Sequence, residues 1–273
     1  KNAEAANFPF CTIDPNIGVV DVIDKRLDQL TKLSNSKKKV YANITFVDIA
    51  GLVKGASKGE GLGNKFLSHI REVDAIIHLL RCFESEKITH VNTEVNPIND
   101  LETIKTEILL SDINIIEKKL EKSKKKNLNA KEIEVLKAAL NQLNKGKDLN
   151  IKSDDENKIL SSIGLLSIKP KIIVCNVDET SLKKGNNFIE SVKKKLPNEK
   201  IIIICADIED QIMGLDKDER ETFMKEVGLN KTGLNQLIKE GYDLLGLNTF
   251  FTSGIEESRS WTIKRDTYAR KAA

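Results

Sequence analysis

The chain has 273 residues, so we expect one large domain or two to three smaller ones. It is 40% hydrophobic and 31% charged, as a globular protein should be, and its net charge of +3 excludes a basic field over the whole molecule. Contact with nucleic acid would have to be made by the local lysine runs 37–39, 124–126 and 193–195. The alternative is that these runs are ordinary solvated surface. No apolar run approaches a membrane span, and the four cysteines and three histidines lack metal-ligand spacing.

Strand patterns alternate with helical patterns along most of the chain. Residues 18–22 and 44–47 are predicted as two strands that pair antiparallel across a lysine-rich segment. Near-continuous apolar runs at 75–80, 171–175 and 201–205 predict buried strands of a parallel sheet. The helical patterns lie at 63–71, 98–109, 188–195 and 234–245. This alternation predicts a doubly wound α/β domain.

The middle and the end of the chain differ from this pattern. Residues 112–160 contain no strand signal, and apolar residues recur there every three or four positions on both sides of a turn-like stretch, 123–129. We predict an inserted α-helical hairpin of coiled-coil type, with a charged disordered insert as the alternative. Two β-rich pieces after Gly246 predict the opening hairpin of a small β-rich domain. The expected division is 1–111 and 161–246 for the α/β domain, 112–160 for the insert and 247–273 for the β-rich start.

The end of the strand at 44–49, with the residues that follow it, carries the strongest functional signal. It reads Asp48-Ile49-Ala50-Gly51, and in P-loop GTPases and ATPases an Asp-x-x-Gly at this place senses the γ-phosphate. The carboxylate of Asp48 would hold Mg²⁺ through a water, and the Gly51 amide would bind the γ-phosphate. Alone the motif is short enough to be a chance turn. A glycine-rich loop follows it, and we interpret this loop as a mobile switch rather than a separate anion-binding loop. Its glycines are Gly55, Gly59, Gly61 and Gly63.

Three further residues are candidates for the reaction itself. Thr12 stands where a first switch loop supplies a hydroxyl to Mg²⁺, with an ordinary surface turn as the alternative. Leu52 follows Gly51, where Ras-like enzymes carry a water-orienting glutamine. Because leucine cannot polarise water, we expect slow turnover and another catalytic group. His90 is the candidate among the histidines, with a structural role as the alternative, and His78 fits a core position in a strand.

The loop after the strand at 171–175 is a candidate base-binding site. It reads Asn176-Val177-Asp178-Glu179, whereas a GTPase has Asn-Lys-x-Asp, whose Asp accepts the guanine N–H groups. Glu179 would misplace that carboxylate, and the backbone of Val177 can instead accept the adenine amino group. A chance strand-to-helix turn is the alternative. Cys205 and Ala206 follow the next strand, where backbone amides pack against the base.

The sequence contains no G-x-x-x-x-G-K-[ST] motif, since Gly146-Lys147 lacks the earlier Gly and the following Ser or Thr. That P-loop is the cradle for the β-phosphate. We therefore expect these residues alone not to hydrolyse ATP.

In the order and spacing of its motifs the chain closely resembles the YchF/Obg-like ATPase family, within the translation-factor-related P-loop GTPases. The segments that carry the resemblance are 7–16, 47–72, 81–91, 176–179 and 250–263. The resemblance implies an α/β G domain of the P-loop NTPase class, an inserted coiled-coil arm and a C-terminal TGS domain, of which 247–273 is the first part. It also implies a P-loop just before the position of Lys1.

The same resemblance implies a function and roles for particular residues. Members of that family bind ATP as well as or better than GTP, and they act with ribosomes in translation or stress responses in the cytosol. Thr12 and Asp48 match the Mg²⁺-linked switch positions, Val177 the adenine-contacting backbone, and His90 the proposed catalytic histidine. Two alternatives remain. One is an Obg-type GTPase, against which Val177 and Glu179 argue. The other is a non-enzymatic ribosome- or RNA-binding module that uses the arm and the TGS domain and has a vestigial nucleotide pocket.

Overall fold

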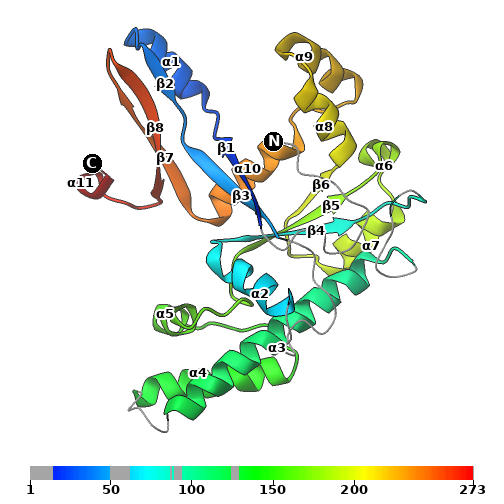
Figure 1. The fold of residues 1–273 in the computed structure, drawn as a ribbon, viewed down its shortest axis with the longest axis vertical. Helices are drawn as coiled ribbons and strands as arrows, with labels where there is room; N and C mark the ends of the chain where they lie inside the picture. Colours follow the sequence, from blue (N-terminus) through cyan, green and yellow to red (C-terminus); the bar gives the residue numbers. More distant parts are fainter. Residues whose placement is uncertain (1–14, 50–61, 87, 89–93, 124–128, 273) are drawn as a thin grey trace.

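The computed structural model describes residues 15–49, 62–86, 88, 94–123 and 129–272 (Figure 1). The strands are β1 Asn16–Asp21, β2 Lys38–Val40, β3 Asn43–Asp48, β4 Ile76–Arg81, β5 Lys171–Asn176, β6 Ile201–Ile204, β7 Leu247–Ser253 and β8 Glu257–Lys264. The helices are α1 Lys25–Leu33, α2 Leu62–Glu72, α3 Pro97–Ser123, α4 Ala130–Asn144, α5 Asp154–Ser162, α6 Glu179–Lys184, α7 Asn187–Lys195, α8 Ala206–Gly214, α9 Lys217–Glu226, α10 Gly233–Leu244 and α11 Ala269–Ala272.

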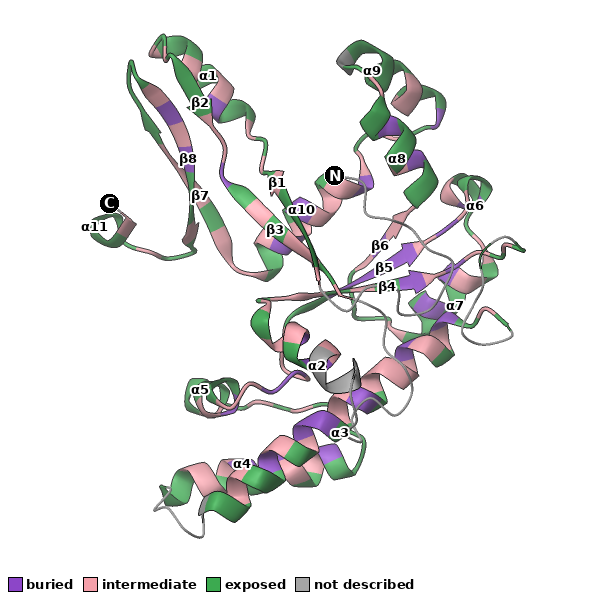
Figure 2. Ribbon diagram, viewed as in Figure 1, coloured by how far each residue is buried: buried purple, intermediate pink, exposed green. Residues whose placement is uncertain are grey.

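The centre of the fold is a parallel sheet in the order β4-β5-β6, with Ile76 opposite Lys171 and Ile173 opposite Ile201. Its middle strand is buried on both faces. On one face it packs with residues of α7 and α8, and on the other with Leu237 of α10. Such two-sided cover explains the unbroken apolar run in the sequence of β5. The predicted doubly wound α/β arrangement is confirmed, and Figure 2 shows the buried residues gathered at this sheet and along α3.

The predicted antiparallel pair near the start of the chain is also confirmed. β1 pairs with β3, from Asn16 opposite Asp48 to Asp21 opposite Asn43. The connection between them is more than a lysine-rich link, because it contains α1 and β2. Asp24 caps α1 by accepting a hydrogen bond from the Arg26 backbone N–H at 2.9 Å.

The insert forms an arm, which extends at the bottom of Figure 1. α3 has 27 residues, or a length of about 40 Å, and α4 packs against it. Ile116 and Leu136 form the arm core, together with residues of α5 and the segment after it. The helical hairpin is thus confirmed. The insert was predicted to begin at residue 112, but α3 continues through that position without a break. The division of the chain into domains therefore stays a prediction. Among the described residues, no helix is both long and apolar enough to cross a membrane.

Near the end of the chain, β7 and β8 form the predicted hairpin, with Phe250 opposite Trp261 and their rings stacked at 6.3 Å. β2 pairs in parallel with β8, which makes a sheet in the order β2-β8-β7. Helix α1 covers one face of it, where Arg26 lies 4.9 Å from the centre of the Phe251 ring. An early segment of the chain is thereby built into the C-terminal sheet.

Candidate nucleotide-binding site

The structure describes the residues predicted to bind the base, but only some of those predicted to bind the phosphates and Mg²⁺. Seven predicted residues lie outside the described part of the chain, so their roles stay predictions: Thr12, Gly51, Leu52, Gly55, Gly59, Gly61 and His90. Gly63 lies in the first turn of α2. The predicted base-binding residues lie at the carboxyl ends of β5 and β6, at the edge where open α/β sheets bind their ligands, and Asp48 ends β3 in the separate β1-β3 sheet.

The two predicted base-binding loops lie together. Asn176 ends β5, and its Oδ1 accepts a hydrogen bond from the Ala206 backbone N–H at 3.0 Å. The N–H of Val177 donates to the carbonyl of Ile204 at 2.8 Å. Val177 and Cys205 are each only 2% exposed, so they can offer backbone groups to a ligand rather than side chains. Burial also raises the pKa of the Cys205 thiol, which keeps it protonated.

Asp178 has a structural role that was not predicted from the sequence. It caps α6 by accepting hydrogen bonds from the Ser181 backbone N–H at 2.9 Å and the Ser181 Oγ at 2.7 Å, and it also accepts one from the Thr180 hydroxyl. These hydrogen bonds, led by that from the Ser181 side chain, lower the pKa of Asp178 to about 2. An Asp three positions before a Ser in a first helical turn was the available signal. Glu179, by contrast, is exposed.

The end of β4 is joined to the same loop. The Cys82 N–H donates to the carbonyl of Asn176 at 2.8 Å, and the Nδ2 of Asn186 donates to the carbonyl of Cys82 at 2.7 Å. Asn186 also caps α7 by accepting from the Ile189 N–H at 2.9 Å. The base-binding loop is therefore fixed on two sides, by α8 and by the chain that leaves β4.

On the phosphate side, Asp48 is the last residue of β3 and is exposed. Its carboxylate has no hydrogen bond or ion pair with any residue that the structure describes. In the described ranges there is also no group of three or more His, Cys, Asp or Glu side chains that could hold a metal ion.

His78 lies on β4 and is half-buried. Desolvation, followed by the nearby charge of Lys171, lowers its pKa to about 4. It is therefore a neutral imidazole near pH 7.

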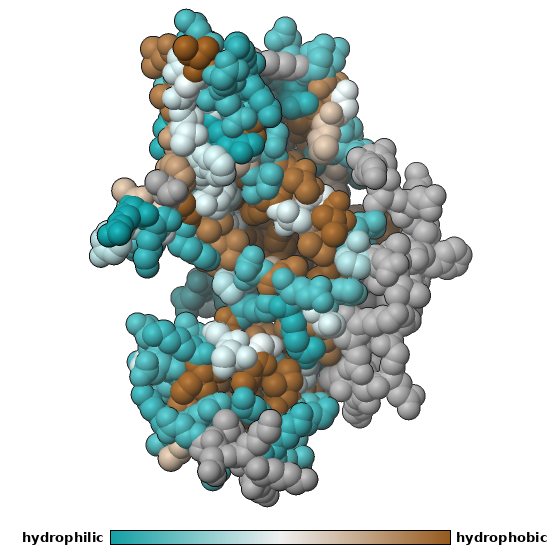
Figure 3. Space-filling model, turned by 60° about the vertical axis from the view of Figure 1, so that its left-hand side comes forward, coloured by the Kyte–Doolittle hydropathy of each residue, from teal (hydrophilic) through white to brown (hydrophobic). Residues whose placement is uncertain are grey.

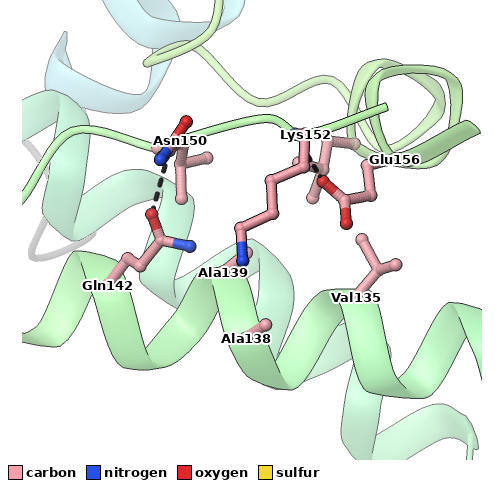
Figure 4. Close-up of a pocket in the computed structure, with 9 residues that line it drawn as sticks. Val135, Ala138, Ala139, Gln142, Asn150, Lys152 and Glu156 are labelled. Atoms are coloured by element: carbon pink, nitrogen blue, oxygen red, sulfur yellow. Dashed lines mark hydrogen bonds between the residues drawn. The ribbon is translucent and has the colours of Figure 1, made fainter. Parts of the chain in front are cut away.

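A separate cavity of about 70 Å³ lies on the arm, between α4 and the segment before α5 (Figure 4). Val135, Ala138 and Ala139 form its apolar wall, and the Asn150 N–H donates to Gln142 Oε1 at 2.9 Å at its rim. Figure 3 shows apolar side chains exposed over the arm and again at the middle of the molecule. This cavity belongs to the arm core and shares no lining residue with the base-binding loops.

The parallel strands β5 and β6, whose carboxyl ends bring Asn176 and Ala206 together, are those of a nucleotide-binding α/β domain of the P-loop NTPase class. In agreement, residues 1–112 match a family model described as 50S ribosome-binding GTPase.

Comparison with known proteins narrows this class to one family. The chain is 44% identical over 283 residues to the "Ribosome-binding ATPase YchF" of Bacillus subtilis, covering 99% of this chain and 77% of the relative. It is also 44% identical over 279 residues to the protein of that name from Escherichia coli O157:H7, with the same coverage. A solved structure, titled as the Schizosaccharomyces pombe YchF GTPase, has a TM-score of 0.83 at 35% identity and covers 98% of this chain and 75% of its own. The chain belongs to the YchF family, and the resemblance predicted from its motifs is confirmed.

Proposed function

We propose that the protein is a cytoplasmic, ribosome-associated nucleotide switch that binds ATP better than GTP and hydrolyses it slowly with Mg²⁺. Relatives in Bacillus subtilis and Escherichia coli are named ribosome-binding ATPases, and the related yeast structure is titled a GTPase. The observation that carries the preference for ATP is the base-binding loop, where Asn176 is bound to the Ala206 N–H and Asp178 is occupied as a helix cap.

The loop favours adenine for two physical reasons. The carboxylate of Asp178 is already hydrogen-bonded as the N-cap of α6. The acid that could bind a guanine is therefore Glu179, whose side chain is one methylene longer than the Asp of a GTPase motif. The Val177 N–H is bound to Ile204, whereas its carbonyl accepts no hydrogen bond from another described residue. A free carbonyl oxygen is an acceptor for the adenine amino group and has no complementary donor on the guanine O6 edge.

The residues present fit Mg²⁺. Asp48 offers an exposed carboxylate that has no partner among the described residues, and Mg²⁺ prefers one or two carboxylates plus phosphate oxygens and water over an all-protein cage. Thr12 would supply a second protein oxygen. Mg²⁺, when bound, neutralises charge on the phosphates. Asp48, at the end of β3, would hold the ion through a water. Gly51, three residues later, is the proposed γ-phosphate sensor.

Turnover is proposed to be slow because Leu52 stands in place of a water-orienting glutamine. We assign the role of positioning the water to His90. The residues 1–273 contain no P-loop motif, so we propose that this chain by itself is inactive and that activity requires a P-loop.

We propose that the arm and the β7–β8 hairpin contact the ribosome, including its RNA. The lysine run 37–39 offers little free charge for RNA, because its members pair with acids. Lys37 lies 2.6 Å from Glu256, and Lys39 lies 2.6 Å from Asp28. In the run 193–195, Lys194 has no acidic partner among the described residues, while Lys195 pairs with Glu102 at 2.7 Å.

Titration of the full-length protein with ATP and with GTP, both with Mg²⁺, tests the adenine assignment. We expect ATP to bind more tightly than GTP. Far tighter binding of GTP would support the Obg-type GTPase instead, and failure to bind either would support a ribosome-binding module with a vestigial pocket.

A further inference from the structure

Asn186 binds two separate parts of the protein with the two ends of its side-chain amide. It is the N-cap of α7, where its Oδ1 accepts a hydrogen bond from the Ile189 N–H at 2.9 Å. Its Nδ2 donates to the carbonyl of Cys82 at 2.7 Å, 104 positions earlier in the chain. A helix N-terminus needs only an acceptor, which Ser or Asp would also supply. The bond to Cys82 is therefore a second role, and it requires the amide donor.

Cys82 bonds to both ends of the segment 176–186. Its N–H donates to the carbonyl of Asn176 at 2.8 Å, and its own carbonyl accepts from Asn186. Cys82 is fully buried just after β4, so water does not compete for either bond. The segment between these two attachments contains the base-binding residues of β5 and the whole of α6. Gly185 ends α6 with a φ of 73°, a value that favours glycine, and Asn186 follows directly.

The first attachment fixes the backbone next to the Val177 carbonyl, which is the proposed acceptor for the adenine amino group. The peptide group between Asn176 and Val177 is bonded on both sides. Its oxygen accepts from the Cys82 N–H, and its N–H donates to the carbonyl of Ile204 at 2.8 Å. Immediately after Val177, Asp178 is fixed as the N-cap of α6. The direction of the Val177 carbonyl thus depends on bonds before and after it, and one of these is the bond to Cys82.

We propose that Asn186 is a positioning residue for recognition of the base. By holding the Cys82 carbonyl it closes the segment 176–186, and it thereby keeps the Val177 carbonyl where this group accepts from adenine. The inference rests on the proposed function, in which this loop binds the base of ATP. Guanine carries an acceptor, O6, in place of the adenine amino group, so it gains no hydrogen bond from that carbonyl. Loss of the Asn186 donor should therefore weaken the binding of ATP more than that of GTP.

The test uses the full-length protein and the variant Asn186→Ser, which keeps an N-cap acceptor for α7 and removes the donor to Cys82. Asn129→Ser is the matched control. Asn129 caps α4 by accepting from the Lys131 N–H at 3.2 Å, and its amide donates to no described residue. Asn186→Asp is a second variant, in which the cap is again kept and a carboxylate oxygen replaces the donor to the Cys82 carbonyl.

Two measurements are made on each protein. Equilibrium titrations with fluorescent analogues of ATP and of GTP give the two affinities, and the GTP titration also shows that the site is folded. Hydrogen exchange of a peptide covering 176–186, without nucleotide, reports whether the segment is held closed.

We expect Asn186→Ser to weaken ATP binding by about 3- to 10-fold, the range for one hydrogen bond, and to change GTP binding by less than about twofold. Asn186→Asp should weaken ATP binding at least as much. Both variants should speed exchange in 176–186, and Asn129→Ser should change neither the exchange nor the affinities. A purely structural role would instead weaken the binding of both nucleotides to the same degree, because it would act on the whole site.

Three results with Asn186→Ser would overturn the inference: unchanged exchange in 176–186, unchanged affinity for ATP, or equal losses for ATP and GTP. Tighter binding of GTP than of ATP by the wild type would refute the adenine assignment and the positioning role together. A wild type that prefers ATP, beside an Asn186→Ser variant with the same preference, would overturn the positioning role alone. The two failures can therefore be told apart.

Discussion

Arg71, near the end of α2, donates a 2.7 Å hydrogen bond from Nη2 to the Oγ of Ser111 in α3. α2 is the first described helix after the Asp48-x-x-Gly51 segment, and α3 is the first helix of the arm. The same junction has an apolar core, in which Leu67 and Ile70 of α2 pack with Leu166, and Ile108 of α3 packs against them. A displacement of α2 would therefore act directly on the base of the arm.

Asp112 stabilises this junction from the arm side. It is fully buried and accepts hydrogen bonds from the backbone N–H groups of Leu166 at 2.9 Å and Ser167 at 2.8 Å. We expect Asp112→Ala to lower the free energy of unfolding by about 2–4 kcal/mol, because two buried donors lose their acceptor. Urea unfolding measures the loss. Asp155→Ala, which removes an exposed partner of Lys131, is the control and should change little. Equal stability of Asp112→Ala and wild type would contradict this account of the junction.

His78 predicts a dependence of stability on pH. In the unfolded chain a histidine takes up a proton near pH 6.5, whereas folded His78 remains neutral down to about pH 4. Between these values the unfolded state binds more protons, so the folded state loses stability as the pH falls from 6.5 to 4, by up to about 3 kcal/mol. Urea unfolding of wild type and His78→Leu across this range measures it. The variant should show a shallower slope; identical slopes would mean that His78 is not neutral in the fold.

Gly233 is needed where α10 begins beside β6. A Cβ there would lie 2.5 Å from Cγ2 of Ile204 and 3.0 Å from Oε1 of Glu209, which accepts hydrogen bonds from the first amides of α10. We expect Gly233→Ala to lower the free energy of unfolding by about 1–3 kcal/mol through overpacking. Gly214→Ala is the matched control, since a Cβ at Gly214 meets no atom within 4 Å. Equal unfolding midpoints for the two variants in urea would show that the clash is relieved without cost.

Asn176→Ala tests the base-binding loop. The substitution removes the acceptor of the Ala206 N–H and so the bond that joins the two base-binding loops, and we expect ATP affinity to fall by about 10-fold or more, or roughly 1.4 kcal/mol. Equilibrium titration of the full-length variant with a fluorescent ATP analogue measures the change. Asn150→Ala, on the arm, should bind as wild type does. Unchanged affinity in Asn176→Ala would place the base elsewhere.

The parts of the fold that were predicted correctly are those with a strong local pattern. The apolar run of β5 and the periodic stripes of α3 and α4 each identify an element without knowledge of its partner. β2 was missed because Lys38–Val40 has no strand pattern, and its partner β8 is distant in sequence. α9 was also missed, although its capping box, Asp216 with Glu219, was available as a local signal.

In the candidate site too, only the residues marked by a local sequence pattern were predicted correctly. The ends of β5 and β6 identified Asn176 and Ala206, because parallel strands bring their carboxyl ends to one edge. The hydrogen bonds from Asn186 to Cys82 and from Arg71 to Ser111 depend on how loops and helices pack. A polar side chain near a strand or helix end looks the same in the sequence whether it faces water or holds a loop.

In the proposed switch the nucleotide state controls the association with ribosomes, which co-sedimentation measures. Full-length wild type and Asp48→Ala would be sedimented with purified ribosomes, with and without ATP and Mg²⁺. We predict that ATP changes the bound fraction of the wild type and leaves that of Asp48→Ala unchanged. Equal binding by both proteins, with or without ATP, would contradict the switch and favour a ribosome-binding module with a vestigial nucleotide pocket.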